Sequence, residues 1–516
     1  MRLNRSQNAI RNSAFGILNK IVTILFPFIV RTVFINILGA EYLGLNSLFS
    51  SILSVLSLTE LGFSSAIVFS MYKPIAQDDT DTINALLCFY KRVYRVVGTV
   101  ICVFGLLLVP FLPELINGTY PEDVNLIAVY LVYLFNTVIS YFMYAYLSAL
   151  ISAFQREDLL SRINIFISIG MYLLQLICLL IVKNYYVYLL VMPVFTVVNN
   201  LRTAYVAKKY FPDYTPKGTL PAEVKSDIKE KVSGLFVSKI CSVTRNSFDS
   251  IFISMFIGLT ETAIYNNYYF IMTSIVSVMS IFTNSITAGV GNSVSMDSVE
   301  KNYADMRKMN FLYMWLSGWC TICLFCLYQP FMKIWVGEEL MFPFPAVVLI
   351  CAYFYTLKLG DIRTVYVQAA GLWWENRYRA VAEAVANLAL NYLLGKYFGV
   401  YGIIAATLIS LFFINYCYGS QLIFRYYFKE QKISRYFLEH TFYFAVTCIC
   451  CFFTYFVCAF MKDGIFWFMI RITVCVIVPN IIYFLLYSRL KIFKEAVPWI
   501  LSKFRSLKNS DAFDGH

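Results

Sequence analysis

The fold is decided by the stretch VSGLFVSKICSVTRNSFDSIFISMFIG, residues 232–258. It is long enough to cross a bilayer core, which takes about 20 apolar residues, yet it carries charges well inside its ends. At 100° per residue, a single polar stripe about 120° wide contains Lys239, Ser242, Arg245, Asn246 and Asp249. A charge at mid-membrane costs roughly 2.5–3.5 kcal/mol on insertion scales, so we expect the stripe to face a bundle interior or a watery cavity.

The composition is that of a chain that lies mostly in hydrocarbon. Of the 516 residues, 59% are hydrophobic and 14% are charged, and the mean hydropathy is +0.67. Soluble proteins carry about 25% charged residues. The sequence therefore predicts an all-α polytopic membrane protein.

Apolar runs of spanning length predict about fourteen transmembrane helices. The first lobe has its predicted spans at residues 12–37, 44–71, 88–112, 125–153, 162–182 and 185–207. The second lobe has them at 232–257, 263–291, 309–332, 343–370, 377–395 and 400–424, and a final pair follows at 438–461 and 465–487. The division between 162–182 and 185–207 rests only on Lys183 and Asn184.

The predicted loops differ strongly in charge. With this span count, 31 Lys and Arg lie on one side of the membrane and four on the other. The positive-inside rule then predicts a multi-pass protein with both termini in the cytoplasm. The net charge of +12 follows from this topology and from contact with anionic membrane lipids, so we expect no nucleic-acid partner.

A basic linker, PDYTPKGTLPAEVKSDIKEK at 212–231, separates two halves. The predicted domains are an N-terminal six-helix lobe at 1–210, a cytoplasmic basic linker at 211–231, a C-terminal six-helix lobe at 232–430, and helices 13 and 14 with a cytoplasmic tail at 431–516.

The two lobes contain a weak internal repeat. GAEYLGLNSLFSSILSVLS from Gly39 resembles GLTETAIYNNYYFIMTSIVS from Gly258, and with one residue inserted Asn46 aligns with Asn266. Six helices per copy return the chain to the same side, so the repeats are parallel. Transporters built from such repeats bind substrate between the halves and alternate its access.

Three phrases carry a resemblance to a known family. EAVANLALNYLLGKYFGVYGIIAATLIS at 383–410 combines an E–N–L pattern with G-x-x-G and then T-L-x-S. LTELGF at 58–63 and NSAFGILNKIV at 12–22 are also typical. Over nearly its whole length the chain resembles the polysaccharide (O-antigen or capsule-type) flippase family of the multidrug/oligosaccharidyl-lipid/polysaccharide exporter superfamily.

This resemblance implies a flippase for polyprenyl-pyrophosphate-linked oligosaccharide, which it moves from the inner to the outer leaflet of the bacterial plasma membrane. It also implies partners in the lipid-linked oligosaccharide itself and in polysaccharide polymerase or export machinery. It implies no cofactor.

The predicted spans hold more cations than acids. When charged residues near the span ends are counted with the adjoining loops, seven cations lie within the spans: Lys20, Arg31, Lys239, Arg245, Lys358, Arg363 and Arg471. On the same count four acids stand against these: Glu60, Asp249, Asp361 and Glu383. A surplus of three positive charges suits a cavity that must accept a pyrophosphate.

We name six of these residues as substrate-binding candidates: Arg31, Lys239, Arg245, Asp249, Lys358 and Asp361. Arg245 and Asp249, one turn apart, can also simply neutralise each other. Arg31, Arg363 and Lys20 divide evenly between a cavity role and an interface role. For Arg471 the sequence favours a structural role, because its long side chain can reach the membrane surface.

A second polar stripe lies on the span at 377–395. Glu383, Asn387 and Asn391 recur every four residues, and we assign them, with Glu60, either to coupling or to interhelical hydrogen bonding. The two readings stay open.

The sequence lacks enzyme signatures. Its two histidines, His440 and His516, form no metal motif, and no nucleophile elbow or Walker loop occurs. Cys320, Cys323 and Cys326 form a CxxCxxC, but inside an apolar span without neighbouring His, Asp or Glu, so we read them as packing residues and predict no metal site. We predict a transporter that is not an enzyme.

Two alternatives remain on sequence grounds. A multidrug or cation-coupled exporter of the same superfamily would favour an acidic cavity and twelve helices. A membrane glycan polymerase or glycosyltransferase would need a larger external loop than the one around Glu114, Glu122 and Asp123.

Overall fold

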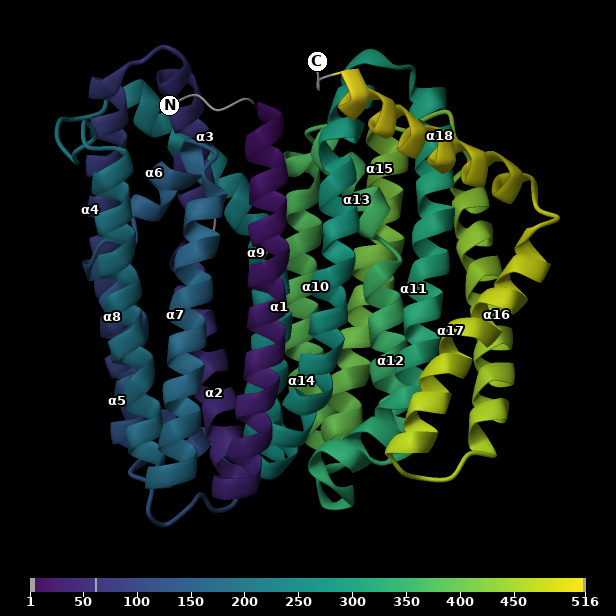
Figure 1. The fold of residues 1–516 in the computed structure, drawn as a ribbon, viewed down its shortest axis with the longest axis horizontal. Coiled ribbons are helices and arrows are strands. Elements are labelled where there is room, and N and C mark those ends of the chain that lie inside the picture. The colour runs from purple at the N-terminus through teal and green to yellow at the C-terminus, as the bar shows by residue number, and fades with distance from the viewer. Residues whose placement is uncertain (1–4, 61–62, 514–516) are drawn as a thin grey trace. The chain divides into compact units, whose positions relative to one another are not determined.

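The computed structural model describes residues 5–60 and 63–513; the side chains of residues 5–10, 59, 60, 227, 229–231, 233–242 and 503–513 lie outside this description. The described residues form helices and no strand (Figure 1). The chain contains two compact units, Met1–Asn266 and Asn267–His516.

The first unit contains nine helices in the described residues. They are α1 (Arg5–Leu38), α2 (Ala40–Leu56), α3 (Phe63–Ala76), α4 (Thr80–Leu107), α5 (Leu126–Phe142), α6 (Leu147–Ala153), α7 (Glu157–Ile177), α8 (Tyr185–Tyr210) and α9 (Ala222–Phe256). Helix α10 (Leu259–Met296) begins in this unit and continues into the next.

The second unit continues with eight further helices in its described part. They are α11 (Val299–Val336), α12 (Phe344–Lys358), α13 (Asp361–Ala369), α14 (Trp373–Ile409), α15 (Gly419–Tyr426), α16 (Ile433–Ala459), α17 (Ile465–Tyr487) and α18 (Lys491–Phe513). A π-helical segment, Ser410–Tyr418, joins α14 to α15.

The all-α membrane fold predicted from the sequence is confirmed, but the count of fourteen spans is not. In the described residues nine helices are long and apolar enough to cross a membrane, or eleven if each of two bent pairs is one span. One bent pair is α4 with Val109–Leu115 (61°), and the other is α5 with α6 (57°). The other predicted spans fall on helices that are too short or too charged to count as spanning, or they share one continuous helix with a neighbouring span.

The predicted division at Lys183 and Asn184 is confirmed. Lys183 adopts a left-handed conformation (φ 52°), and the Asn184 side chain accepts hydrogen bonds from the backbone N–H groups of Tyr186 and Val187. This is an N-cap that starts α8. Asp79 caps α4 in the same way, and its hydrogen bond with Thr82 lowers the pKa of Asp79.

A glycine precedes a helix at the same point of each copy of the predicted repeat. Gly39 (φ 103°) immediately precedes α2, and Gly258 (φ 143°) immediately precedes α10. Both conformations are rarely open to residues with a side chain. The aligned segments therefore start in the same way in both copies.

Helix α18 was not predicted from the sequence, which places only a tail after residue 487. It crosses the long helices of the second unit at a steep angle (Figure 1). Phe493 packs against Trp315 of α11 and Phe484 of α17, with ring centroids 6.0 and 5.8 Å apart. An amphipathic segment of this kind contains no long apolar run, so a search for spans overlooks it.

The turn between the predicted spans 377–395 and 400–424 depends on two glycines. Gly399 has non-helical backbone (φ 56°, ψ −136°) inside α14. At Gly402 an added Cβ would lie 2.0 Å from the carbonyl oxygen of Leu394, so the backbone segments touch.

We predict that Gly402→Ala destabilises the protein by about 1–3 kcal/mol, because the backbone must move to admit the methyl group. Gly16→Ala, where the added Cβ meets nothing within 4 Å, is the matched control and should leave stability unchanged or raised. The measurement is the melting temperature of the purified protein. Equal melting temperatures for the two variants would contradict the close approach.

Candidate functional site

Two residues of the polar stripe of α9, Arg245 and Asp249, are buried within the first unit. Asp249 is fully buried and Arg245 is 8% exposed. The hydroxyl of Tyr265 donates to Asp249 Oδ2 at 2.9 Å. Because α9 packs chiefly against α2 and α3, protein covers this part of the stripe.

Arg31 also faces protein in the first unit. It is partly buried on α1 and interacts electrostatically with Tyr188 of α8, whose ring centroid lies 4.9 Å from that of Phe34. Lys20, on the same helix, is exposed. Two further candidates, Lys239 and Glu60, have side chains outside the described part of the chain.

Lys358 and Asp361 meet at a helix break in the second unit. Lys358 ends α12 and Asp361 starts α13, with Leu359 and Gly360 between them. Lys358 Nζ lies 2.8 Å from Asp361 Oδ2, which also accepts from the hydroxyl of Tyr313 at 2.5 Å. The Lys358 side chain is 5% exposed and that of Asp361 is 30% exposed. The pair is thus neutral, with its carboxylate at an accessible edge.

Arg363, which follows on α13, binds backbone rather than an acid. Its guanidinium donates to the carbonyl oxygens of Asn415 (2.7 Å) and Tyr416 (3.1 Å) and to Ser420 Oγ (3.3 Å). These acceptors lie in and just beyond the π-helical segment Ser410–Tyr418, where the regular helical hydrogen bonding is interrupted. Arg363 therefore satisfies backbone groups that the π-helix leaves open, which is a structural role.

Two glycines make room for this guanidinium. A Cβ on Gly360 would lie 2.8 Å from Arg363 Nη2, and a Cβ on Gly419 would lie 2.7 Å from Nη1. The space beside Gly360 and Gly419 therefore fits the planar guanidinium closely.

Glu383 connects the start of α14 to the π-helical segment Ser410–Tyr418. It is 1% exposed, and its Oε2 accepts from Arg379 Nη1 (2.6 Å) and from Asn415 Nδ2 (2.9 Å). Sequence reasoning missed Arg379, because it lies near the start of a predicted span and was assigned to a loop. A carboxylate one helical turn after an arginine is the signal that could have found it.

Asn387 and Asn391 continue the stripe. Both are buried, and Asn387 donates to Thr407 (3.0 Å) and Ser410 (3.3 Å), while Asn391 donates to Asn387 (3.4 Å). These bonds join the two parts of α14 on either side of Gly399. The interhelical contacts are therefore present, and a coupling role for the stripe stays a prediction.

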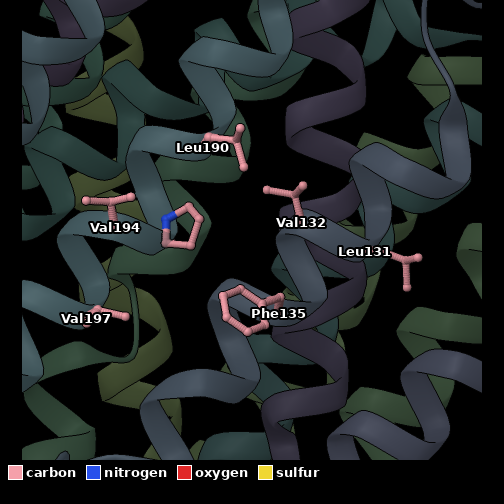
Figure 2. Close-up of a pocket in the computed structure, with 7 residues that line it drawn as sticks. Leu131, Val132, Phe135, Leu190, Val194 and Val197 are labelled. Atoms are coloured by element: carbon pink, nitrogen blue, oxygen red, sulfur yellow. The ribbon is translucent and has the colours of Figure 1, made fainter.

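A pocket of about 410 Å³ between α5 and α8 is apolar throughout (Figure 2). Leu131, Val132, Phe135, Leu190 and Val194 are among its lining residues. It offers no partner to a charged headgroup and fits hydrocarbon instead.

Residues 9–290 match the sequence profile of a family described as "Polysaccharide biosynthesis protein". The chain belongs to this family. No curated protein matches its sequence.

Solved structures similar to this family member are transporters. One is a lipid II flippase, MurJ, in an inward closed conformation, with TM-score 0.63 and 14% identity over 93% of this chain and 99% of that one. Another is an inward-facing multidrug resistance MATE family transporter of the MOP superfamily, with TM-score 0.59 and 13% identity over 77% of this chain and 94% of that one. A third is a MOP superfamily transporter from Pyrococcus furiosus, with TM-score 0.54 and 13% identity over 82% of this chain and 96% of that one. At these identities the likeness shows the fold, which is that of the superfamily expected from the sequence.

We predict that Glu383→Gln destabilises this family member by about 3–5 kcal/mol, because it removes the carboxylate that buried Arg379 binds. The double variant Arg379→Gln/Glu383→Gln should regain part of that loss. The control is Asp297→Asn, which breaks the exposed pair with Lys301 and should cost no more than about 1 kcal/mol. Melting temperatures of the purified variants test this. A double variant as unstable as the sum of its single variants would contradict the pairing.

Proposed function

We propose that the protein is a flippase that moves polyprenyl-pyrophosphate-linked oligosaccharide from the inner to the outer leaflet of the bacterial plasma membrane. The observation that carries this proposal is the family match over residues 9–290 in a chain with a transporter fold. Both termini are then cytoplasmic, and a polysaccharide polymerase or export machinery takes up the product.

The charged groups inside the helices suit a pyrophosphate headgroup. We assign its binding to Arg31, Lys239, Arg245 and Lys358. Asp361 balances the positive charge of Lys358 until substrate arrives, and Asp249 lies one turn from Arg245, where it can balance that charge. Because the Asp361 side chain is partly exposed, a phosphate can reach the pair and take the place of the carboxylate.

The lipid tail stays in the bilayer, and α16 and α17 give it a surface. These two helices lie beyond the predicted repeat, and they pack against each other and against α11. Their outward side chains are large and apolar: Phe452 is 67% exposed, Phe456 55%, Phe466 72% and Met469 58%. Such a face is compatible with an acyl or polyprenyl chain.

Alternating access requires a contact that can open, and the end of α9 provides one. In the first unit, Asn117 N–H donates to Ser254 O (2.9 Å), Asn117 Nδ2 donates to Phe256 O (2.7 Å), and Ser254 Oγ donates to Leu115 O (2.8 Å). These bonds tie the end of α9 to the segment after α4. We propose that they break and reform in each transport cycle.

We predict that a disulfide between Asn117→Cys and Ser254→Cys stops transport. A backbone N···O contact of 2.9 Å places the two Cα atoms about 5–6 Å apart, within the range that a disulfide spans. In cells lacking the native gene, surface glycan should disappear under oxidation and return on reduction. Each single cysteine variant serves as control. Undiminished glycan with the disulfide fully formed would show that this contact stays closed.

We also predict that Arg31→Gln reduces surface glycan at least tenfold in the same complementation assay, while Lys20→Gln does not. The two residues lie on one helix, but only Arg31 faces protein. Membrane abundance of both variants must match that of the unchanged protein. Full activity of Arg31→Gln would remove Arg31 from the site.

The alternatives give different results in cells and in vitro. Unchanged drug resistance with lost glycan in a deletion strain separates the flippase from a multidrug exporter. Formation of a glycosidic linkage by the purified protein would instead identify a polymerase or glycosyltransferase.

A further inference from the structure

Three cysteines from three helices gather inside the second unit. They are Cys326 of α11, Cys458 of α16 and Cys475 of α17. Their sulfur atoms all lie within 4.8 Å of one another, and all three side chains are buried. The sequence groups Cys326 with Cys320 and Cys323 instead, and Cys458 and Cys475 lie more than 130 residues further along the chain.

The spacing of the sulfur atoms is close to that of a three-coordinate thiolate site. Metal–sulfur bonds of about 2.3 Å in a trigonal arrangement place the sulfurs about 4.0 Å apart. Movements of a few tenths of an ångström would therefore bring all three onto one ion. No histidine or carboxylate joins this cluster among the described residues, so a soft ion with low coordination number, such as Cu(I), fits better than a tetrahedral one.

The cluster borders a pocket that contains charged side chains. A cavity of about 600 Å³ has Cys326 and Cys458 in its wall, together with Lys333, Asp463 and Arg471. Lys333 Nζ lies 2.8 Å from Asp463 in the loop between α16 and α17, and this hydrogen bond lowers the pKa of Asp463. These charged groups offer an ion a route toward the two cysteines in the wall.

Arg471 supplies positive charge beside the sulfurs. Its Nη2 donates to the carbonyl oxygen of Met461 at 2.7 Å, which fixes the guanidinium in the pocket wall that also contains Cys458. Three thiolates and Cu(I) carry a net charge of −2, which the guanidinium partly offsets. This lowers the desolvation cost of burying the site.

We propose that Cys326, Cys458 and Cys475 form a binding site for one soft monovalent cation of the Cu(I) type. Binding releases three thiol protons to water in the pocket, and it involves no oxidation or reduction. The bound ion joins α16 and α17 to α11. This site is separate from the groups that we assign to transport.

The test is an anaerobic Cu(I) titration of the purified full chain, in reducing buffer, against a competing chelator of known affinity. The unchanged protein should bind one ion per chain with release of about three protons. Cys326→Ser and Cys458→Ser should each weaken binding at least 100-fold. Cys448→Ser, an exposed cysteine on α16, should leave binding unchanged.

A second readout separates metal binding from packing. Cu(I) should raise the melting temperature of the unchanged protein and of Cys448→Ser, but not that of Cys326→Ser or Cys458→Ser. The proposal is overturned if the unchanged protein binds no Cu(I), or if Zn²⁺ binds more tightly than Cu(I). It is also overturned if Cys448→Ser weakens Cu(I) binding as much as Cys326→Ser or Cys458→Ser does. Both Cys326 and Cys458 line the pocket, so each of the two variants tests the site by itself. If one of them fails to fold, the other still decides whether the cysteines bind Cu(I).

Discussion

A charge inside hydrocarbon must find its partner within the protein, and this constraint organises the second unit. Lys358 is held by Asp361, Arg379 by Glu383, and Arg363 by carbonyl oxygens of the π-helical segment. The Lys358–Asp361 pair spans the break between α12 and α13, and Arg363 binds the irregular segment Ser410–Tyr418. Arg379 and Glu383 instead pair one turn apart inside α14. Two of these three buried cations therefore lie at helix irregularities, where free backbone groups and side chains meet.

The length of the apolar runs was enough to predict a helical membrane protein, because the thickness of a bilayer fixes how long a span must be. It could not predict where helices break. The segment Ser410–Tyr418 contains no glycine or proline that would mark a break, and its π-helical form is stabilised by Arg363, which lies about fifty residues earlier. Likewise α12 and α13 form a single predicted span at 343–370, and the break appears only with the Lys358–Asp361 pair. These are tertiary effects that local periodicity does not contain.

The same limit applies to the candidate site. Charge within a span pointed to Arg31, Arg245, Asp249, Lys358 and Asp361, because ionised residues are rare there. Their partners are ordinary residues on other helices. Tyr265 binds Asp249 and Tyr313 binds Asp361, and nothing in the pattern of 39 tyrosines singles these two out. The cysteine cluster follows the same rule, since its members come from three separate helices.

The kind of partner separates a structural charge from one that can serve transport. Arg363 is bound by backbone carbonyls, which cannot leave without unwinding the segment that carries them. Lys358 is bound by a side-chain carboxylate with an exposed edge, and in the function that we propose this carboxylate rotates away when a phosphate offers equal charge in its place. A cation with no partner would destabilise the substrate-free protein, and one with a fixed partner could not receive a substrate. An exchangeable ion pair meets both requirements, and in the second unit the Lys358–Asp361 pair at the α12–α13 break has this form.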